Sequence, residues 1–164
     1  DVSENFFLGR ELLSPNWLGR RFGWLDRASM KRITREKLAE LRVRIRDLDA
    51  QCGSLSGGQR QALAIARAAA WCNSALLLDE PTSALGAEQH HEVLELIREA
   101  RASERAVVLI SHQMPDILTT CDRVVVLRLG RVVAVLGRDQ IKADDLVGYI
   151  TGATGPKQTM EATP

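Results

Sequence analysis

Two continuous runs of apolar residues, Ala75–Leu78 and Ala106–Ile110, constrain the fold of this chain more than any other feature of its sequence. Short apolar runs without alternation are typical of strands that are buried on both faces, as in a parallel sheet. The 87–103 segment between them places its apolar residues at helical spacing. A strand, a helix and a second strand in this order predict an α/β domain with a largely parallel sheet.

The rest of the chain predicts further helices and a second pair of strands. Ser3 and Asp26 are expected to cap the first two helices, because such side chains accept hydrogen bonds from the first N–H groups of a helix. Residues 9–25, rich in Gly, Pro and Arg, are expected to form a loop, and residues 153–164 a disordered tail. The expected helices cover 3–8, about 26–46, 58–71, 114–120 and 144–150, and the expected strands cover 124–128 and 132–136.

Charge and cysteine content exclude few functions. The 22 Lys and Arg residues nearly balance the 21 Asp and Glu residues, so the net charge of +1 indicates no particular partner. Basic residues dominate the stretch 20–46, which is typical of a solvated helix face; a surface facing anionic lipid headgroups or an acidic partner is the alternative.

Cys52, Cys72 and Cys121 form no CxxC pair, which favours reduced thiols in cytoplasm. No apolar run approaches the roughly 20 residues of a membrane span.

A glycine turn, Leu55-Ser56-Gly57-Gly58-Gln59, opens the helix expected over 58–71. Two glycines allow a ligand to approach the backbone closely, and the start of a helix offers unpaired N–H groups and the positive end of its dipole. Ser56 adds a hydroxyl donor. This combination suits a phosphate, although Ser-Gly-Gly taken alone is more often a plain helix cap.

An acidic pair, Asp79 and Glu80, follows the first apolar run directly. The carboxyl ends of parallel strands are where α/β sheets bind ligands. One carboxylate can hold Mg²⁺, usually through water, and a second at the edge of the core can accept a proton from an attacking water. The alternative for an isolated Asp-Glu pair is a capping residue at the end of a strand.

His112 ends the second apolar run in the same way. A lone histidine at such a point is more often a hydrogen-bonded loop residue. Its place beside the strand of the acidic pair favours contact with a γ-phosphate and with the attacking water. His90 and His91 fall on the surface of a predicted helix and receive no role.

These motifs follow one another in the order found in the ABC ATPase family, which the chain resembles over about residues 1–152. Leu55–Gln59 is similar to the signature motif of the family, and Leu76–Thr82 to its Walker B motif with the catalytic glutamate. Ser83–Gly86 is similar to the D-loop, and His112 to the switch histidine. The resemblance implies a partial P-loop NTPase fold of the ABC ATPase type, with a helical subdomain over about 1–71 and a catalytic core over about 72–152.

Other segments resemble one branch of this family. Val2–Glu11, Leu25–Arg27 and Tyr149–Ala153 are similar to segments of ATPases from bacterial monosaccharide importers of the fructose or ribose type. This likeness implies a subunit that hydrolyses ATP to power sugar import.

The resemblance also implies a role for each matched residue. Asp79 would serve Mg²⁺, Glu80 would act as general base, and His112 would sense the γ-phosphate. The residues that would contact the γ-phosphate of ATP bound to a second subunit are Ser56, Gly57, Gly58 and Gln59.

The partners implied by the resemblance are a second ATPase subunit and a permease. The family works as a head-to-tail dimer with two ATP molecules at its interface, and its helical part docks on transmembrane permease subunits. This places the protein at the cytoplasmic face of the bacterial inner membrane, with membrane contact only through the permease and no contact with nucleic acid.

Two departures from the family pattern are visible. Gly86 stands where many members carry Asp, a mild change. The larger one is that Gly-x-x-x-x-Gly-Lys-Ser/Thr occurs nowhere, since no lysine follows a glycine. We therefore expect a fragment whose upstream part carries that loop and which is inactive alone. The alternatives are a non-transport ABC ATPase, such as a chromosome-maintenance or translation factor, or an inactive module that only binds the permease.

Overall fold

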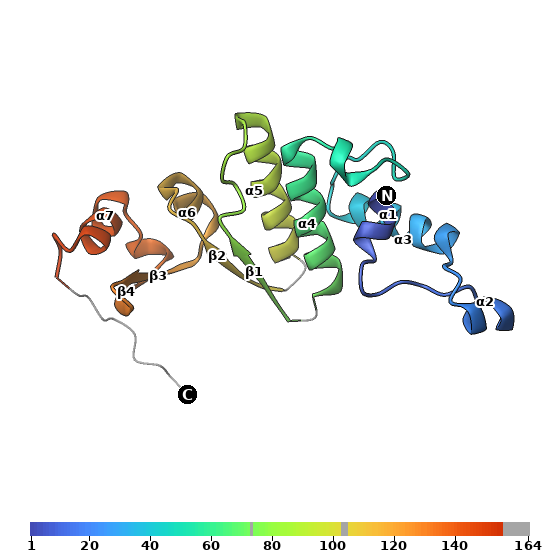
Figure 1. Ribbon diagram of the computed structural model, residues 1–164. Coiled ribbons are helices and arrows are strands. Elements are labelled where there is room, and N and C mark those ends of the chain that lie inside the picture. The colour runs from blue at the N-terminus through green and yellow to red at the C-terminus, as the bar shows by residue number, and fades with distance from the viewer. Residues whose placement is uncertain (73, 103–104, 156–164) are drawn as a thin grey trace. The chain divides into compact units, whose positions relative to one another are not determined.

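The computed structural model describes residues 1–72, 74–102 and 105–155. The chain divides into two compact units, Asp1–Ile110 and Ser111–Pro164. Figure 1 labels elements of both units and colours them from blue at the N-terminus to red at the C-terminus. Each unit has its own hydrophobic core, so each is described by itself.

A pair of parallel strands forms the sheet of the first unit. β1 (Ala75–Asp79) pairs with β2 (Ala106–Ile110) in register from Ala75 opposite Ala106 to Asp79 opposite Ile110. The crossover between them contains α5 (Ala87–Ala102). The predicted strand–helix–strand unit is therefore confirmed, and its predicted strand bounds differ from the observed ones by one residue at most.

One face of this sheet carries the helices. Leu76 and Leu78 are buried in the core with residues of α5 and of α4 (Gly57–Trp71). Leu77, between them, is 70% exposed, and Val108 and Ile110 of β2 are also exposed. The prediction that β1 is buried on both faces is thus wrong for the described residues, because both of these helices pack on the same side.

Three more α-helices belong to the same unit. They are α1 (Val2–Phe6), α2 (Trp17–Phe22) and α3 (Arg27–Glu40), followed by the short 3-10 helix η1 (Cys52–Ser54). The largest fully buried side chains here are Phe6, Phe7 and Met30. Phe7 meets the ring of Trp71 edge-on with centroids 5.1 Å apart, and Trp71 Nε1 donates to the carbonyl oxygen of Phe6 at 3.1 Å. Aromatic packing thereby fixes α1 against the end of α4.

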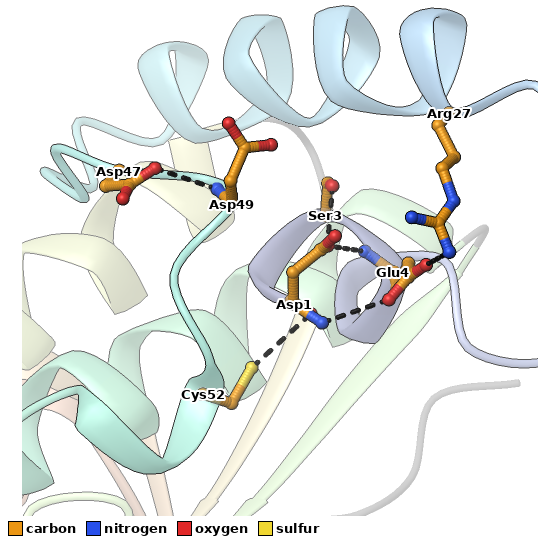
Figure 2. A network of polar contacts seen from close by, with 7 residues as sticks. All are labelled: Asp1, Ser3, Glu4, Arg27, Asp47, Asp49 and Cys52. Carbon is orange, nitrogen blue, oxygen red and sulfur yellow. Dashed lines mark hydrogen bonds and ion pairs between the residues drawn. The ribbon is translucent and has the colours of Figure 1, made fainter.

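The cap of α1 is Asp1, not Ser3 as predicted. The Asp1 side chain accepts from the N–H of Glu4 at 2.7 Å, so the helix begins before Ser3, which lies buried inside it. Glu4 in turn pairs with Arg27 of α3 at 2.7 Å. Figure 2 shows this network, in which the Cys52 thiol also lies 3.7 Å from the carbonyl oxygen of Asp1. These contacts join three segments that are distant in sequence.

Two other predictions need correction. Residues 9–25 contain α2 and a bridge between Leu13 and Leu25, not only loop. Asp26 caps α3 as predicted, but this helix ends at Glu40 and not near residue 46. The chain leaves it at Arg42, which has a φ of 55°, a left-handed conformation that ends a helix.

The second unit is built on an antiparallel hairpin. β3 (Arg123–Arg128) and β4 (Arg131–Gly137) pair on either side of Leu129 and Gly130, both of which have positive φ, as a tight two-residue hairpin turn requires. The predicted second pair of strands is confirmed. The helical elements of this unit are α6 (Met114–Thr120), η2 (Arg138–Gln140) and α7 (Ala143–Thr151). Its core includes Ile117, Leu136 and Tyr149.

Several predictions concern the chain as a whole. Of the predicted disordered tail, residues 156–164 lie outside the described part of the chain. The predicted boundary near residue 72 between a helical and a catalytic part stays a prediction. Cys52, Cys72 and Cys121 all lie in the described part of the chain, and none of them forms a disulfide. Among the described residues, no helix has the length and apolar character that spanning a membrane requires.

Candidate functional site

Residues 56–59 of the glycine turn form the N-terminal end of α4. Ser56 is the N-cap, and its hydroxyl oxygen accepts from the N–H of Gln59 at 3.2 Å. The Gln59 side chain returns the contact by accepting from the N–H of Ser56 at 3.0 Å. This reciprocal capping box uses the acceptor groups of both side chains. The hydroxyl hydrogen of Ser56 and the amide hydrogens of Gln59 remain as possible donors to a phosphate.

The two glycines of the turn have different surroundings. A Cβ built on Gly57 would meet nothing within 4 Å, so this backbone position is open to a ligand. A Cβ built on Gly58 would lie 2.3 Å from Cγ of Gln89. Their N–H groups precede the first i to i−4 hydrogen bond of the helix, which Arg60 makes to Ser56 at 2.9 Å. Gly57 therefore supplies open backbone, whereas Gly58 allows α5 to pack closely.

Gln89 is a residue that the sequence analysis missed. Its side chain lies against Gly58, and its Oε1 would be 2.6 Å from a Cβ on Gly86. Gln89 thus fills the space left by a glycine at the start of α4 and by a second glycine just before α5. The available signal was two glycines with no assigned packing partner, but nothing in the sequence indicates which side chain they admit.

Asp79 and Glu80 end the first strand as predicted. Asp79 is the last residue of β1 and is exposed. The N–H of Glu80 still donates to the carbonyl oxygen of Ile110 at 2.9 Å, which extends the β1–β2 ladder by one bond. Both carboxylates therefore leave the backbone at the carboxyl end of a parallel pair, where ligands bind in α/β sheets.

Glu80 has a φ of 46°, a conformation that is uncommon for residues with a side chain. Beyond it, the N–H of Ser83 donates back to the Glu80 carbonyl at 3.1 Å. Pro81 and Thr82 are buried, and Ala84 has a second positive φ, 58°. Strained backbone of this kind persists where the surrounding structure holds it and is concentrated at functional sites. This turn therefore fixes the direction in which the Glu80 side chain leaves the sheet.

His112 lies in the second unit and is exposed. It follows Ile110, the partner of Asp79 in the ladder, by two residues. The Ser111 hydroxyl accepts from the N–H of Gln113 at 3.0 Å, so His112 is the middle residue of a short hydrogen-bonded turn. The joint action of His112 and Glu80 stays a prediction.

The donor groups fit Mg²⁺ and a phosphate only in part. Within residues 1–72, 74–102 and 105–155 there is no cluster of three metal-binding side chains. Mg²⁺ usually keeps several waters and binds through one or two carboxylates together with phosphate oxygens, so the exposed Asp79 suits the ion when a nucleotide supplies the other ligands. The glycine turn provides hydrogen-bond donors and no negative charge, as a phosphate requires.

Comparison with known proteins shows which family the chain resembles. The ABC transporter family matches residues 3–83. The chain is 42% identical over 156 residues to the fructose import ATP-binding protein FrcA of Rhizobium meliloti, covering 94% of this chain and 60% of that protein. It is 40% identical over 170 residues to the ribose import ATP-binding protein RbsA of Chromobacterium violaceum, covering 99% of this chain and 32% of that protein. The chain thus spans about three fifths and about one third of these two relatives.

Solved structures give the same result for the fold. An ATP-binding cassette of an ABC transporter is similar with a TM-score of 0.68 and 24% identity, covering 90% of this chain and 61% of that one. A metal-chelate type ABC transporter in an inward-facing conformation is similar with a TM-score of 0.67 and 23% identity, covering 93% and 57%. The predicted fold class is confirmed by these likenesses.

Proposed function

We propose that the full-length protein hydrolyses ATP to power import of a monosaccharide, because this chain belongs to the ABC transporter family as part of an ATP-binding domain. The names of the relatives, fructose and ribose import ATP-binding proteins, support this class of cargo. Their similarity also favours a transport ATPase over a chromosome-maintenance or translation factor.

The observation that carries the proposal is the position of Asp79 and Glu80. These residues are adjacent at the carboxyl end of β1, and the bond from Glu80 to Ile110 holds their backbone against β2. The Asp79 side chain is exposed, whereas Oε2 of Glu80 is shielded from solvent. Two neighbouring carboxylates in unlike surroundings can take unlike roles, one at an ion and one at a proton.

In the proposed reaction, Glu80 acts on a water molecule. The water oxygen attacks the γ-phosphorus of ATP, the bond to the β-phosphate oxygen breaks, and one proton of the water passes to the Glu80 carboxylate. Mg²⁺, held by Asp79, would neutralise charge on the phosphate oxygens. His112 donates a hydrogen bond to the γ-phosphate and helps to orient the water.

The glycine turn completes the site from a second copy of the protein. Ser56 donates its hydroxyl hydrogen and Gln59 its amide hydrogens to the γ-phosphate of ATP bound to the partner subunit. Gly57 allows this phosphate to approach, because a Cβ at this position would meet no group from elsewhere in the described chain within 4 Å. Hydrolysis in this arrangement requires a head-to-tail dimer.

The same proposal defines the location and partners. The protein lies at the cytoplasmic face of the bacterial inner membrane, where it docks on transmembrane permease subunits. The identity of the relatives as import proteins supports this location.

The test is an assay of the full-length gene product, reconstituted with its permease in proteoliposomes. We expect Mg²⁺-dependent ATP hydrolysis that increases when a fructose- or ribose-loaded binding protein is present. EDTA should abolish it. Hydrolysis that is independent of permease and sugar would reject the transport function, and no hydrolysis by the assembled complex would reject the ATPase.

A further inference from the structure

The segment Leu12–Asp26, which we call the aromatic loop, exposes large rings at its surface. Trp17 is 73% exposed, Phe22 65% and Trp24 58%. Single exposed apolar residues are common on proteins, but contiguous groups of them mark interaction sites. Phe22 and Trp24 are stacked with centroids 5.9 Å apart, so at least two of the rings form one apolar surface.

This loop has a defined backbone. The N–H of Asp26 donates to the carbonyl oxygen of Leu12 at 2.7 Å, and the N–H of Ser14 donates to the carbonyl oxygen of Trp24 at 2.7 Å. These two bonds close the loop at its base. Asn16 caps α2 by accepting from the N–H of Gly19 at 2.6 Å. Gly19 is buried, and a Cβ there would lie 2.4 Å from Cβ of Ser14. The small residues pack inward, and the rings are held outward.

Positive charge accompanies the rings. Arg20 and Arg21 are exposed and stand three and four residues after Trp17, which places them on the same side of α2. No Asp or Glu occurs between Leu12 and Leu25. The flanking acids hydrogen-bond elsewhere, since Glu11 accepts from the N–H of Gly9 at 2.9 Å and Asp26 from the N–H of Ser29 at 3.0 Å.

Aromatic rings beside arginines, without acids, have the chemistry of a surface that contacts an anionic lipid bilayer. Trp prefers the membrane–water interface, where its ring enters the headgroup region and its N–H stays hydrated. Arginines near the surface of anionic lipid each strengthen the attraction. Figure 1 shows α2 at an extremity of the first unit, away from β1 and β2.

We infer that the aromatic loop binds the anionic surface of the membrane directly, with Trp17, Phe22 and Trp24 in the headgroup region. This goes beyond the proposed function, because it adds a lipid contact to the contact with the permease and needs no nucleotide. It gives a function to part of the basic stretch 20–46. Its failure would leave the proposed ATP hydrolysis unaffected.

The test is co-sedimentation of the full-length gene product, without its permease, with vesicles of phosphatidylcholine containing 30% phosphatidylglycerol as the probe. We expect binding that falls when salt is raised from about 0.1 to 0.5 M, because the attraction is screened. The change R20Q/R21Q should weaken binding by roughly 10- to 30-fold. The matched control R35Q/R46Q removes two exposed arginines elsewhere and should weaken it far less.

Two further variants separate ring insertion from charge. W17S/F22S/W24S should abolish binding, whereas L127S/L129S, which removes two exposed side chains of the β3–β4 hairpin, should not. W17F/W24F should still bind, yet lose most of the quenching of tryptophan emission by brominated lipid.

Three outcomes would overturn the inference. They are equal binding to vesicles of pure phosphatidylcholine, equal losses in the two arginine variants, and binding by the triple variant at wild-type strength. A fourth outcome would also overturn it. If the protein does not bind vesicles and a crosslinker at position 17 reacts with the permease, the partner of the aromatic loop is a protein and not lipid.

Discussion

A side chain on Gly58 would collide with Gln89, because the position of its Cβ lies 2.3 Å from Cγ and 2.5 Å from Cβ of that residue. Gly57, one residue earlier, faces open space. The start of α4 is therefore in tight contact with α5 at one glycine and accessible to a ligand at the other. Adjacent glycines that look equivalent in the sequence thus serve different purposes.

The first prediction uses this difference. Gly58→Ala should lower the free energy of unfolding by about 1–3 kcal/mol, because the methyl group overpacks the contact with Gln89. Gly57→Ala should leave it unchanged or raise it by up to about 1 kcal/mol, because alanine favours the helix. Urea unfolding of both variants measures the effect.

A second change checks the cause of the first effect. Gln89→Gly in the Gly58→Ala background should recover part of the lost stability, since it removes both colliding atoms. If Gly57→Ala proves as destabilising as Gly58→Ala, the packing explanation is wrong. ATP hydrolysis should show the reverse order, with Gly57→Ala impaired although it is folded.

The second prediction concerns Glu80. Glu80→Gln should lower the rate of ATP hydrolysis by the full-length protein by about 10² to 10⁴, because the amide cannot accept the proton of the attacking water. The urea midpoint should hardly change, since the backbone bond to Ile110 is retained. Glu88→Gln, on the exposed first turn of α5, is the control and should hydrolyse ATP at the normal rate. Normal turnover by Glu80→Gln would remove this residue from the mechanism.

The third prediction concerns Thr34 of α3, which is fully buried. Its Oγ1 has no hydrogen-bond partner within the described part of the chain. An unsatisfied buried hydroxyl costs about 1–3 kcal/mol, so Thr34→Val should raise the free energy of unfolding by about 1 kcal/mol. Thr34→Ser keeps the hydroxyl and loses a methyl group, and should lower it. A stabilising serine and a destabilising valine would show that the hydroxyl has a partner.

The fourth prediction is a pH dependence that arises at Asp26. The backbone N–H of Ser29, and then its side chain, hydrogen-bond to Asp26 and lower the pKa of this carboxyl below its usual value. A folded-state pKa below the unfolded one means that ionised Asp26 stabilises the folded state above its unfolded pKa, which is about 3.9. This contribution is lost as pH falls through the lowered pKa.

Asp26→Asn provides the comparison for this effect. Asparagine can cap α3 but does not titrate, so the stability difference between the two proteins should be present at pH 6 and should shrink below about pH 4. Urea unfolding at several pH values measures the difference. A gap that is constant with pH would assign the stabilisation to the shape of the cap and not to its charge.

The sequence predicted best those elements that have strong local signals. β2 and α6 have the predicted bounds, and α4 begins one residue early. An apolar run defines β2, and a capping serine followed by glycines defines the start of α4, without reference to the rest of the chain. The positions of Asp79 and Glu80 at a strand end follow from the same signal.

Other features depend on contacts between distant segments. α2 was missed because Trp17 and Phe22 face outward, so it lacks the pattern of a helix that packs on a core. The predicted helix was longer than α3 because Leu41 and Ile45 continue its apolar spacing on either side of the left-handed turn at Arg42. The role of Gln89 could not be predicted, because it requires α4 and α5 to be placed side by side.

The hydrogen bond from Asp26 to Leu12 has a consequence for engineering and for comparison among relatives. It brings the two ends of the aromatic loop together, so the residues between them form an insert whose removal need not move α3. Such a segment can change in length and chemistry independently of the rest of its unit. It could therefore be transplanted as a single piece between cassettes to exchange their surfaces.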